Sequence, residues 1–211
     1  MMLTKEIFEK ALEERQTKEV RRKLKEGTVA VAGLGGLGSN IALMLARTGI
    51  KKLLLADFDI VDVSNLNRQA YTISQIGMEK TKALEELIRQ VNPWMELELF
   101  QGRITQENIK ELFEEYPIIC EAFDDPRAKA MLVSEVLEKL PEAYIVSGNG
   151  MAGSYSSNTI RTEKKMKRLY VCGDQVSKVS KEESLTAARV SVCAGHEANM
   201  VIRLLLGEKD A

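Results

Sequence analysis

The residues with the clearest chemical role form a run of glycines, followed at a set distance by an acidic residue. Gly33, Gly35 and Gly38 fit the pattern G-x-G-x-x-G. Gly36 lies inside the same run. In this pattern the first glycine makes a tight turn, the second lets a phosphate approach the backbone, and the third lets a helix pack on a strand. Asp57 follows at the spacing expected of a carboxylate that binds a ribose, so the group predicts a nucleotide-binding site.

Two further acidic residues stand where an open α/β sheet binds its ligands. Asp124 and Asp125 directly follow an apolar run at 118–122 that indicates a buried strand. Because ligands of such sheets bind at the carboxyl ends of the strands, both carboxylates are placed for function. Asp125 also has a structural interpretation, since an acidic residue before Pro126 can cap the helix that begins there.

The elements that must position these residues alternate between strands and helices. Apolar runs at 28–32 and 53–56 are typical of buried parallel strands, and the stretch between them has an apolar helix face. The alternation predicts an α/β fold with a Rossmann-like, mostly parallel sheet flanked by helices. Further strands are predicted at 95–100, 118–122, 143–146, 159–161 and 169–171, and further helices at 78–91, 105–115, 127–140 and 193–206.

The chain is predicted to form a single domain over residues 1–211, with residues 1–27 as an N-terminal helical arm. No internal repeat or low-complexity linker divides the sequence. The arm carries scattered apolar positions among many charges, which favours a partly solvated helix over a core helix. Its arginines, Arg15, Arg21 and Arg22, are each interpreted as solvated charges when taken alone.

The composition excludes several classes of protein. The 30 basic and 31 acidic side chains nearly cancel, so the chain is not expected to bind nucleic acid through its net charge. No apolar run approaches the roughly 20 residues of a membrane helix, and the first residues lack an apolar signal core. A cytoplasmic protein without membrane association is therefore predicted.

The order of several motifs resembles the adenylation domain of the ThiF/MoeB/HesA family, the bacterial relatives of the ubiquitin-activating enzymes. The most specific motif is Asn-Leu-x-Arg-Gln, which runs from Asn65 to Gln69 inside a long polar connection at 58–77. The other matches are the glycine run, Asp57-Phe58-Asp59, Gly77-Met78-Glu79-Lys80, and Phe123-Asp124-Asp125. The resemblance covers about residues 28–206, which is most of the chain.

This resemblance implies a reaction, cofactors and partners. Family members use ATP and magnesium to adenylate the C-terminal glycine carboxylate of a small ubiquitin-like sulfur carrier protein, and they form homodimers. The short chain and the segment Tyr170–Asp174 look most like the compact ThiF-like branch of thiamine thiazole biosynthesis, which implies a ThiS-like carrier. Both reactants are anions, so the reaction needs fixed positive charge and a metal.

The resemblance also implies a role for each matching residue. Arg68, Lys80 and Asp124 are expected to be catalytic: the two cations bind phosphates, and the carboxylate holds magnesium. Asn65 is expected to hydrogen-bond a phosphate, and Gln69 to support its loop.

Four further expectations concern the rest of the site. Asp57 would hold the ribose, Asp59 would lie near the phosphates or the metal, and the four glycines would contact the nucleotide. In many relatives an arginine of the N-terminal arm enters the ATP site of a second subunit, and Arg15 is the nearest match.

The chain also departs from the family pattern. Many relatives carry two C-x-x-C pairs that bind zinc, whereas the three cysteines of this chain form no such pair, so zinc is not expected. Some relatives form a covalent conjugate through a cysteine in a crossover loop, but no cysteine occurs between 173 and 192. Cys172 is the one substitute, and it is interpreted as a buried spectator. The lone histidine, His196, is expected to pack rather than to catalyse.

Three alternatives stay open at the level of sequence. An NAD-dependent oxidoreductase would use the glycine run and Asp57 equally well, but it does not explain the Asn65–Gln69 motif. A family member that adenylates a small molecule or a tRNA-bound carboxylate is the second, and the near-neutral charge disfavours the tRNA. The third is a non-catalytic module for dimerisation or carrier binding.

Overall fold

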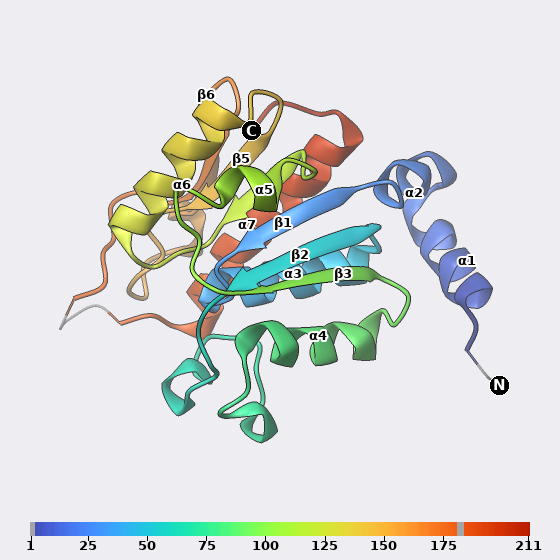
Figure 1. Ribbon diagram of the computed structural model, residues 1–211, viewed down its shortest axis with the longest axis horizontal. Coiled ribbons are helices and arrows are strands. Elements are labelled where there is room, and N and C mark those ends of the chain that lie inside the picture. Colours follow the sequence, from blue (N-terminus) through green and yellow to red (C-terminus); the bar gives the residue numbers. More distant parts are fainter. Residues whose placement is uncertain (1–2, 181–183) are drawn as a thin grey trace.

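The computed structural model describes residues 3–180 and 184–211, which form a seven-stranded sheet with helices on both faces (Figure 1). The strand order is β3-β2-β1-β4-β5-β7-β6, and every neighbouring pair is parallel except β6 with β7. The predicted α/β fold with a mostly parallel sheet is thereby confirmed. The strands are β1 (Thr28–Ala32), β2 (Lys52–Asp57), β3 (Glu96–Gln101), β4 (Ile118–Glu121), β5 (Tyr144–Gly148), β6 (Arg161–Met166) and β7 (Leu169–Gly173).

Helices cover the sheet in two layers, each over its own apolar core. One core lies under α3, α4 and α7, and the other lies under α5 and α6. The helices of the body are α3 (Gly36–Thr48), α4 (Lys80–Val91), α5 (Ile109–Phe113), α6 (Pro126–Lys139) and α7 (Ala187–Leu206). Among the described residues, no helix is long and apolar enough to cross a membrane.

The central strand β1 shows why its sequence is almost entirely apolar. Val29 and Val31 face the core under α3 and α7, while Ala30 and Ala32 face the core under α5 and α6. Both sides of the strand are therefore buried, as is typical of parallel sheets. β1 pairs with β2 on one side and with β4 on the other, so the chain crosses between the two halves of the sheet here. Ligands of open α/β sheets bind at the carboxyl edge of such a crossing point.

The N-terminal arm consists of two helices, α1 (Lys5–Gln16) and α2 (Lys18–Leu24), joined at Thr17. α1 has no buried residue and extends from the amino edge of the sheet (Figure 1). The interpretation of Arg21 as a solvated charge is wrong. Its guanidinium is buried, pairs with Glu9 at 2.8 Å and donates to the carbonyl of Gly49, the C-cap residue of α3. This arginine anchors the arm to the body.

Three predicted elements differ from the observed ones. The helix predicted at 105–115 is only the short α5, because Asn108 accepts a hydrogen bond from the Thr105 backbone and holds the preceding residues in a turn. The strand predicted at 159–161 is instead a 3-10 turn, Ser157–Thr159, followed by the longer β6. The last helix begins at Ala187, six residues earlier than predicted, because its first turns pack under α3.

Candidate active site

The glycine run forms a tight turn between β1 and α3. Gly33 has a φ of +89°, and a Cβ there would lie 2.9 Å from the carbonyl oxygen of Ala122 on the neighbouring strand. A Cβ on Gly38 would lie 1.8 Å from the carbonyl oxygen of Gly33, a severe clash. Both positions therefore require glycine, which agrees with the roles predicted for the first and third glycines.

The middle of the turn is open. The nearest atom to a Cβ placed on Gly35 is Nε2 of Gln69, at 3.9 Å. Gly35 is also the N-cap residue of α3, so no side chain occupies the first N–H groups of this 13-residue helix. An uncapped helix N-terminus beside open space suits a phosphate, because the free N–H groups and the helix dipole both favour an anion.

Asp57 holds this turn from the end of β2. Its carboxylate is buried and accepts the backbone N–H of Leu34 at 2.6 Å and that of Asp59 at 2.8 Å. A carboxylate has about four acceptor positions, so these two bonds leave capacity for a ribose hydroxyl. The ribose contact stays a prediction, and the observed role of Asp57 is to fix the backbone on both sides of the site.

Lys80 meets Asp59 beside this carboxylate. A β-bridge between Ile60 and Glu79 brings the neighbouring Asp59 and Lys80 together. The side chains of Asp59 and Lys80 form an ion pair of 2.9 Å. The Lys80 side chain is only 7% exposed, whereas that of Asp59 is 48% exposed. The ammonium group therefore lies at the floor of the site with one of its three donors engaged by a carboxylate that faces solvent.

Tyr71 is a residue of this site that the sequence analysis did not single out. It is buried, and its hydroxyl donates to the carbonyl oxygen of Leu34 at 2.8 Å, inside the glycine turn. Burial, followed by the nearby Asp57 and Asp59 carboxylates, raises the pKa of the Tyr71 phenol. The phenol therefore remains protonated and keeps its hydrogen bond to the turn.

The Asn65–Gln69 motif follows a short 3-10 turn, Val63–Asn65. Asp62 and Asn65 cap each other's backbone, with Asn65 accepting the Asp62 N–H at 3.0 Å. The hydrogen bonds from Ser64 hold the pKa of Asp62 below its usual range. The half-buried Arg68 donates to the Ser64 carbonyl at 3.1 Å, and its aliphatic part packs against Gly36. The motif thus places Arg68 directly beside the start of α3.

Gln69 has a buried side-chain oxygen that lacks a hydrogen-bond donor. Its side chain is buried next to Gly35, and its Oε1 has no hydrogen-bond partner among the described residues. A buried acceptor without a donor costs about 1–3 kcal/mol. A donor on a bound molecule at Gly35 would remove this cost.

Two acidic residues, Asp124 and Asp125, follow the end of β4, on the other side of β1 from β2. Asp125 accepts the N–H groups of Arg127 and Ala128 at 2.9 and 2.7 Å, so its interpretation as the N-cap of α6 is confirmed. Asp124 is exposed, one residue after Phe123, whose ring would lie 3.0 Å from a Cβ on Gly33. The structure therefore brings Asp124 to the edge that carries the glycine turn.

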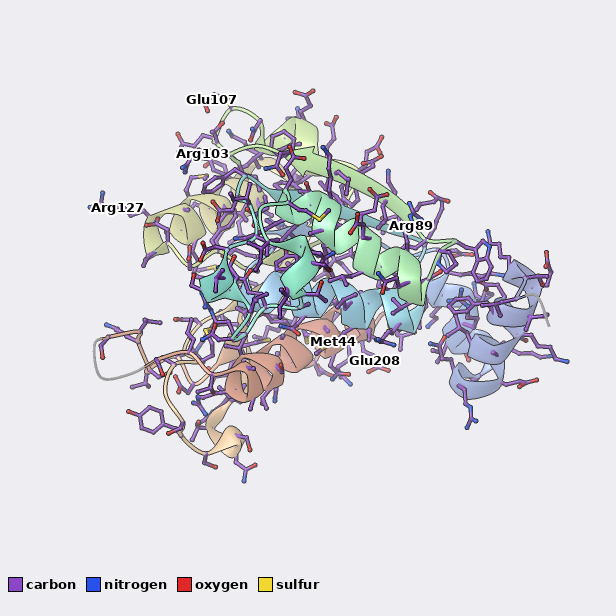
Figure 2. The ribbon with its side chains drawn as sticks, turned by 90° about the horizontal axis from the view of Figure 1, so that it is seen from below. Met44, Arg89, Arg103, Glu107, Arg127 and Glu208 are labelled. Carbon is purple, nitrogen blue, oxygen red and sulfur yellow. The ribbon has the colours of Figure 1, made fainter. Side chains whose placement is uncertain are left out.

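Phe58 and Arg103 form a stacked pair next to Asp57, and sequence reasoning missed the arginine. The Arg103 guanidinium lies 3.8 Å from the centre of the Phe58 ring. The backbone of Phe58 accepts a hydrogen bond from Gln101 at 3.0 Å, which holds the loop after β3 against the end of β2. Figure 2 shows Arg103 and Arg127 on the side of the molecule opposite the N-terminal arm. No sequence motif marks Arg103. The pairing of β2 with β3 brings it to Phe58.

Three predicted features lie outside this group. Arg15 is exposed in the last turn of α1, at the amino edge of the sheet and away from the glycine turn of its own chain (Figure 1). All three cysteines are buried, and burial, followed by the Glu197 charge, raises the pKa of the Cys172 and Cys193 thiols. His196 hydrogen-bonds to Thr162 of β6 at 3.1 Å.

The described part of the chain contains no group of three or more histidine, cysteine, aspartate or glutamate side chains arranged to hold a metal ion. A zinc ion held by protein side chains alone needs three or four such ligands. Magnesium differs, because it is commonly bound by one or two carboxylates together with substrate phosphates and water. An exposed aspartate at a phosphate-binding edge fits that requirement.

Known proteins resemble this chain in sequence and in fold. A model of the ThiF family matches residues 9–211, so the match begins within the arm, earlier than the resemblance in the sequence indicated. "Adenylyltransferase and sulfurtransferase MOCS3" of Anopheles gambiae is 34% identical over 131 residues, which are 61% of this chain and 29% of that protein. "Ubiquitin-like modifier-activating enzyme 5" of Caenorhabditis elegans is 43% identical over 83 residues, 39% of this chain and 20% of that protein. The chain thus spans less than a third of these curated relatives.

Among solved structures, tRNA N6-threonylcarbamoyladenosine dehydratase of E. coli in complex with AMP has the same fold. Its TM-score is 0.86 at 19% sequence identity, and the superposition covers 98% of each chain. A structure of the same protein in complex with ATP superposes with a TM-score of 0.86. At this identity the likeness concerns the fold.

Proposed function

The chain belongs to the ThiF family, and from that premise we propose that it is an ATP-dependent adenylyltransferase that transfers AMP to a carboxylate. One observation carries the proposal. A glycine turn open to phosphate, the buried Lys80 and the exposed Asp124 all lie at the carboxyl edge of the sheet, where β1, β2 and β4 end. This edge is where open α/β sheets bind ligands.

In the proposed reaction a carboxylate oxygen of the acceptor attacks the α-phosphorus of ATP. The bond between that phosphorus and the bridging oxygen breaks, pyrophosphate leaves, and an acyl adenylate remains. The N–H groups at the start of α3 bind phosphate oxygens over Gly35, and Arg68 and Lys80 offset the repulsion between the two anions. Asp59 limits the mobility of the Lys80 ammonium through their 2.9 Å ion pair.

The remaining polar groups of the site fit a bound nucleotide. The free lone pairs of Asp57 suit the ribose, and the unpartnered Oε1 of Gln69 suits a donor on the ligand. Asp124 would hold magnesium, which when bound neutralises charge on the phosphates. The proposed chemistry needs no cysteine, which agrees with the burial of all three thiols.

The first candidate acceptor is the C-terminal glycine carboxylate of a small ubiquitin-like sulfur carrier. The names of the two curated relatives, a sulfurtransferase and a ubiquitin-like modifier-activating enzyme, support this class. The narrower assignment to thiamine thiazole biosynthesis and a ThiS-like carrier rests on the segment Tyr170–Asp174.

A tRNA-bound carboxylate is the second candidate acceptor. It is favoured by the E. coli tRNA N6-threonylcarbamoyladenosine dehydratase, which matches the present chain over 98% of both lengths. The near-equal numbers of basic and acidic residues speak against it, because tRNA binding is largely driven by positive charge.

ATP–pyrophosphate exchange tests the function and separates the acceptors. We expect exchange with a panel of carriers ending in Gly-Gly, no exchange with tRNA, and no exchange without an acceptor. Arg68→Ala and Asp124→Ala are each expected to lower the exchange rate by about 100- to 1,000-fold, since each removes charge stabilisation at the phosphates. Arg22→Ala, on the exposed face of α2, is the matched control. Full exchange in both site variants would exclude the site assignment.

A thermal-shift measurement separates adenylation from the NAD-dependent alternative. ATP with magnesium is expected to raise the melting temperature, because a ligand that binds only the folded state stabilises it. Stabilisation by NADH without any effect of ATP and magnesium would overturn the proposal.

We also propose that the protein is a homodimer in which Arg15 reaches the site of a second copy. The support is the position of Arg15 on an arm that leads away from its own glycine turn (Figure 1). Mixing inactive Arg15→Ala and Arg68→Ala subunits should restore up to about a quarter of the sites, since each mixed dimer holds one intact site. No recovery in confirmed mixed dimers contradicts the exchange of Arg15.

A further inference from the structure

Glu121, the last residue of β4, is fully buried although it carries a carboxylate. A buried charge is costly unless it is paired and hydrogen-bonded. Glu121 meets both conditions through three separate elements. Its Oε2 accepts from Lys129 of α6 and from the Ser147 hydroxyl of β5, each at 2.5 Å, and its Oε1 accepts the backbone N–H of Phe123 at 2.8 Å.

Lys129 connects the Glu121 carboxylate at the end of β4 to the neighbouring strand β5. Its ammonium also donates to the carbonyl oxygen of Gly148 at 2.8 Å, so it connects α6 with the end of β5. The Lys129 side chain is 22% exposed and that of Glu121 is 0% exposed. The carboxylate is therefore shielded from solvent while the ammonium group is partly exposed, and four hydrogen bonds fix the geometry of the pair.

The turn that leaves β4 is held on both sides of Asp124. On one side, Glu121 fixes the N–H of Phe123, and Ala122 donates to the carbonyl oxygen of Ala32 at 2.9 Å. On the other side, the Asp125 carboxylate is fixed by two N–H groups of α6. Asp124 itself is exposed between these two fixed points.

We infer that Glu121 and Lys129 are positioning residues for the proposed adenylyl transfer, because they hold the turn from which Asp124 faces the nucleotide phosphates. This inference rests on the proposed function. The pair does not touch substrate; it acts through the Phe123 backbone. If the pair served stability alone, an apolar pair of similar size would replace it without loss, since such exchanges of buried ion pairs are often neutral or stabilising.

The test measures the affinity for ATP by calorimetry with magnesium and with a chelator, and takes the ratio as the magnesium gain. In the double variant Glu121→Leu with Lys129→Leu, the magnesium gain is expected to fall about tenfold, as is typical when support of a metal ligand is lost. Lys129→Arg keeps a cation that reaches both Glu121 and Gly148, and it is expected to retain the gain. The melting temperature without ligand reports stability separately.

A double-mutant comparison shows whether the effect passes through Asp124. Adding Asp124→Asn to the double variant should cause no further loss of the magnesium gain, because both changes remove the same interaction. Arg21→Met with Glu9→Gln is the matched control, a partly buried ion pair at the opposite edge of the sheet, and it should change the melting temperature but not the gain.

Ser147→Ala, which removes one anchor of Glu121, is a milder variant for the case in which the double variant does not fold. It is expected to lower the magnesium gain about two- to threefold, within the range for loss of one hydrogen bond. An unchanged gain in the folded double variant, or in Ser147→Ala if the double variant is unfolded, overturns the inference. A loss that adds fully to that of Asp124→Asn also overturns it. Absence of ATP binding by the parent protein would instead overturn the proposed function.

Discussion

Asp57 and Glu121 are the last residues of two strands that flank β1, and they perform a similar task in two different ways. Each carboxylate is buried and accepts the backbone N–H of the residue two positions later. Asp57 takes its other bond from the glycine turn, at Leu34. Glu121 instead takes its other bonds from side chains of α6 and β5.

The groups around Asp57 are suited to bind a ligand, whereas those around Glu121 are suited to support the structure beside it. Around Asp57 the bonds are mostly to backbone, and the adjoining Asp59 is half exposed, so the groups remain available to a ligand. Around Glu121 the carboxylate has no exposure and its lysine is mostly buried, so these groups form a closed cluster, in contrast to the open cluster of groups around Asp57. Changes near Asp57 should therefore affect binding, whereas changes near Glu121 should affect the stability and shape of the edge.

Removing one partner from the closed cluster should have the largest effect on stability. Lys129→Met leaves the Glu121 carboxylate buried without its cation, which is expected to cost about 3–5 kcal/mol of unfolding free energy. Urea denaturation measures this loss. Lys82→Met, on α4, removes an exposed i,i+3 pair with Glu79 and should cost about 0–1 kcal/mol. Equal losses in the two variants would erase the distinction between closed and open clusters.

Alanine substitutions at Gly38 and Gly35, both in the glycine turn, should separate effects on stability from effects on ligand binding. Gly38→Ala brings a Cβ against the Gly33 carbonyl, so a loss of about 1–3 kcal/mol or more in unfolding free energy is expected. Gly35→Ala places its Cβ in open space, so the fold should remain while the new methyl group occupies the phosphate position.

Calorimetry with ATP provides the second readout for this pair. For Gly35→Ala we expect at least about a tenfold weaker ATP affinity, equal to about 1.4 kcal/mol, with little change in melting temperature. Unchanged ATP affinity in Gly35→Ala would show that the open turn is not the phosphate site.

An effect that depends on pH concerns Glu197, a third buried carboxylate, whose Oε2 has no hydrogen-bond partner among the described residues. Burial raises the pKa of Glu197 well above 4.5, and the Glu121 charge adds to the rise while Lys129 opposes it. The folded state therefore retains a proton that the unfolded state releases as the pH rises. Glu197 favours folding most below its unfolded pKa, and this contribution is lost as the pH rises toward the folded pKa.

Glu197→Gln removes this titration while keeping the shape of the side chain. The difference in unfolding free energy between variant and parent should shift in favour of the variant as the pH rises from about 5 to about 8. The limit is about 1.4 kcal/mol per pH unit for one proton. Denaturation curves at several pH values measure the difference, and a difference independent of pH would show that Glu197 ionises normally in the folded protein.

Sequence reasoning found the open cluster because its parts are local. The glycine run, Asp57 and the Asn65–Gln69 motif lie within 37 positions of one another, and each has a spacing that follows from one strand–turn–helix unit. The same reasoning missed Tyr71 and Arg103. Tyr71 contributes one hydroxyl to a turn that is 37 positions away, and no periodicity marks such a contact.

The errors in the elements have the same origin. Arg21 has the composition of a solvated charge, but its burial depends on Glu9 and on the carbonyl at the end of α3, which only the folded arm brings together. The helix at 105–115 is shorter than its apolar pattern predicts because the Asn108 side chain accepts the backbone N–H of Thr105, a local hydrogen bond that competes with helix formation.

The sequence by itself determined the α/β fold, the nucleotide turn and the family, because apolar periodicity and short motifs are encoded by neighbouring residues. The tertiary structure alone decided which charges are closed off and which remain open. Glu121, Lys129 and Ser147 belong to three different elements. Lys129 follows Glu121 by 8 positions and Ser147 follows it by 26 positions. A buried carboxylate becomes stable only where the fold supplies its cation and hydrogen-bond donors together, and no linear spacing specifies that meeting.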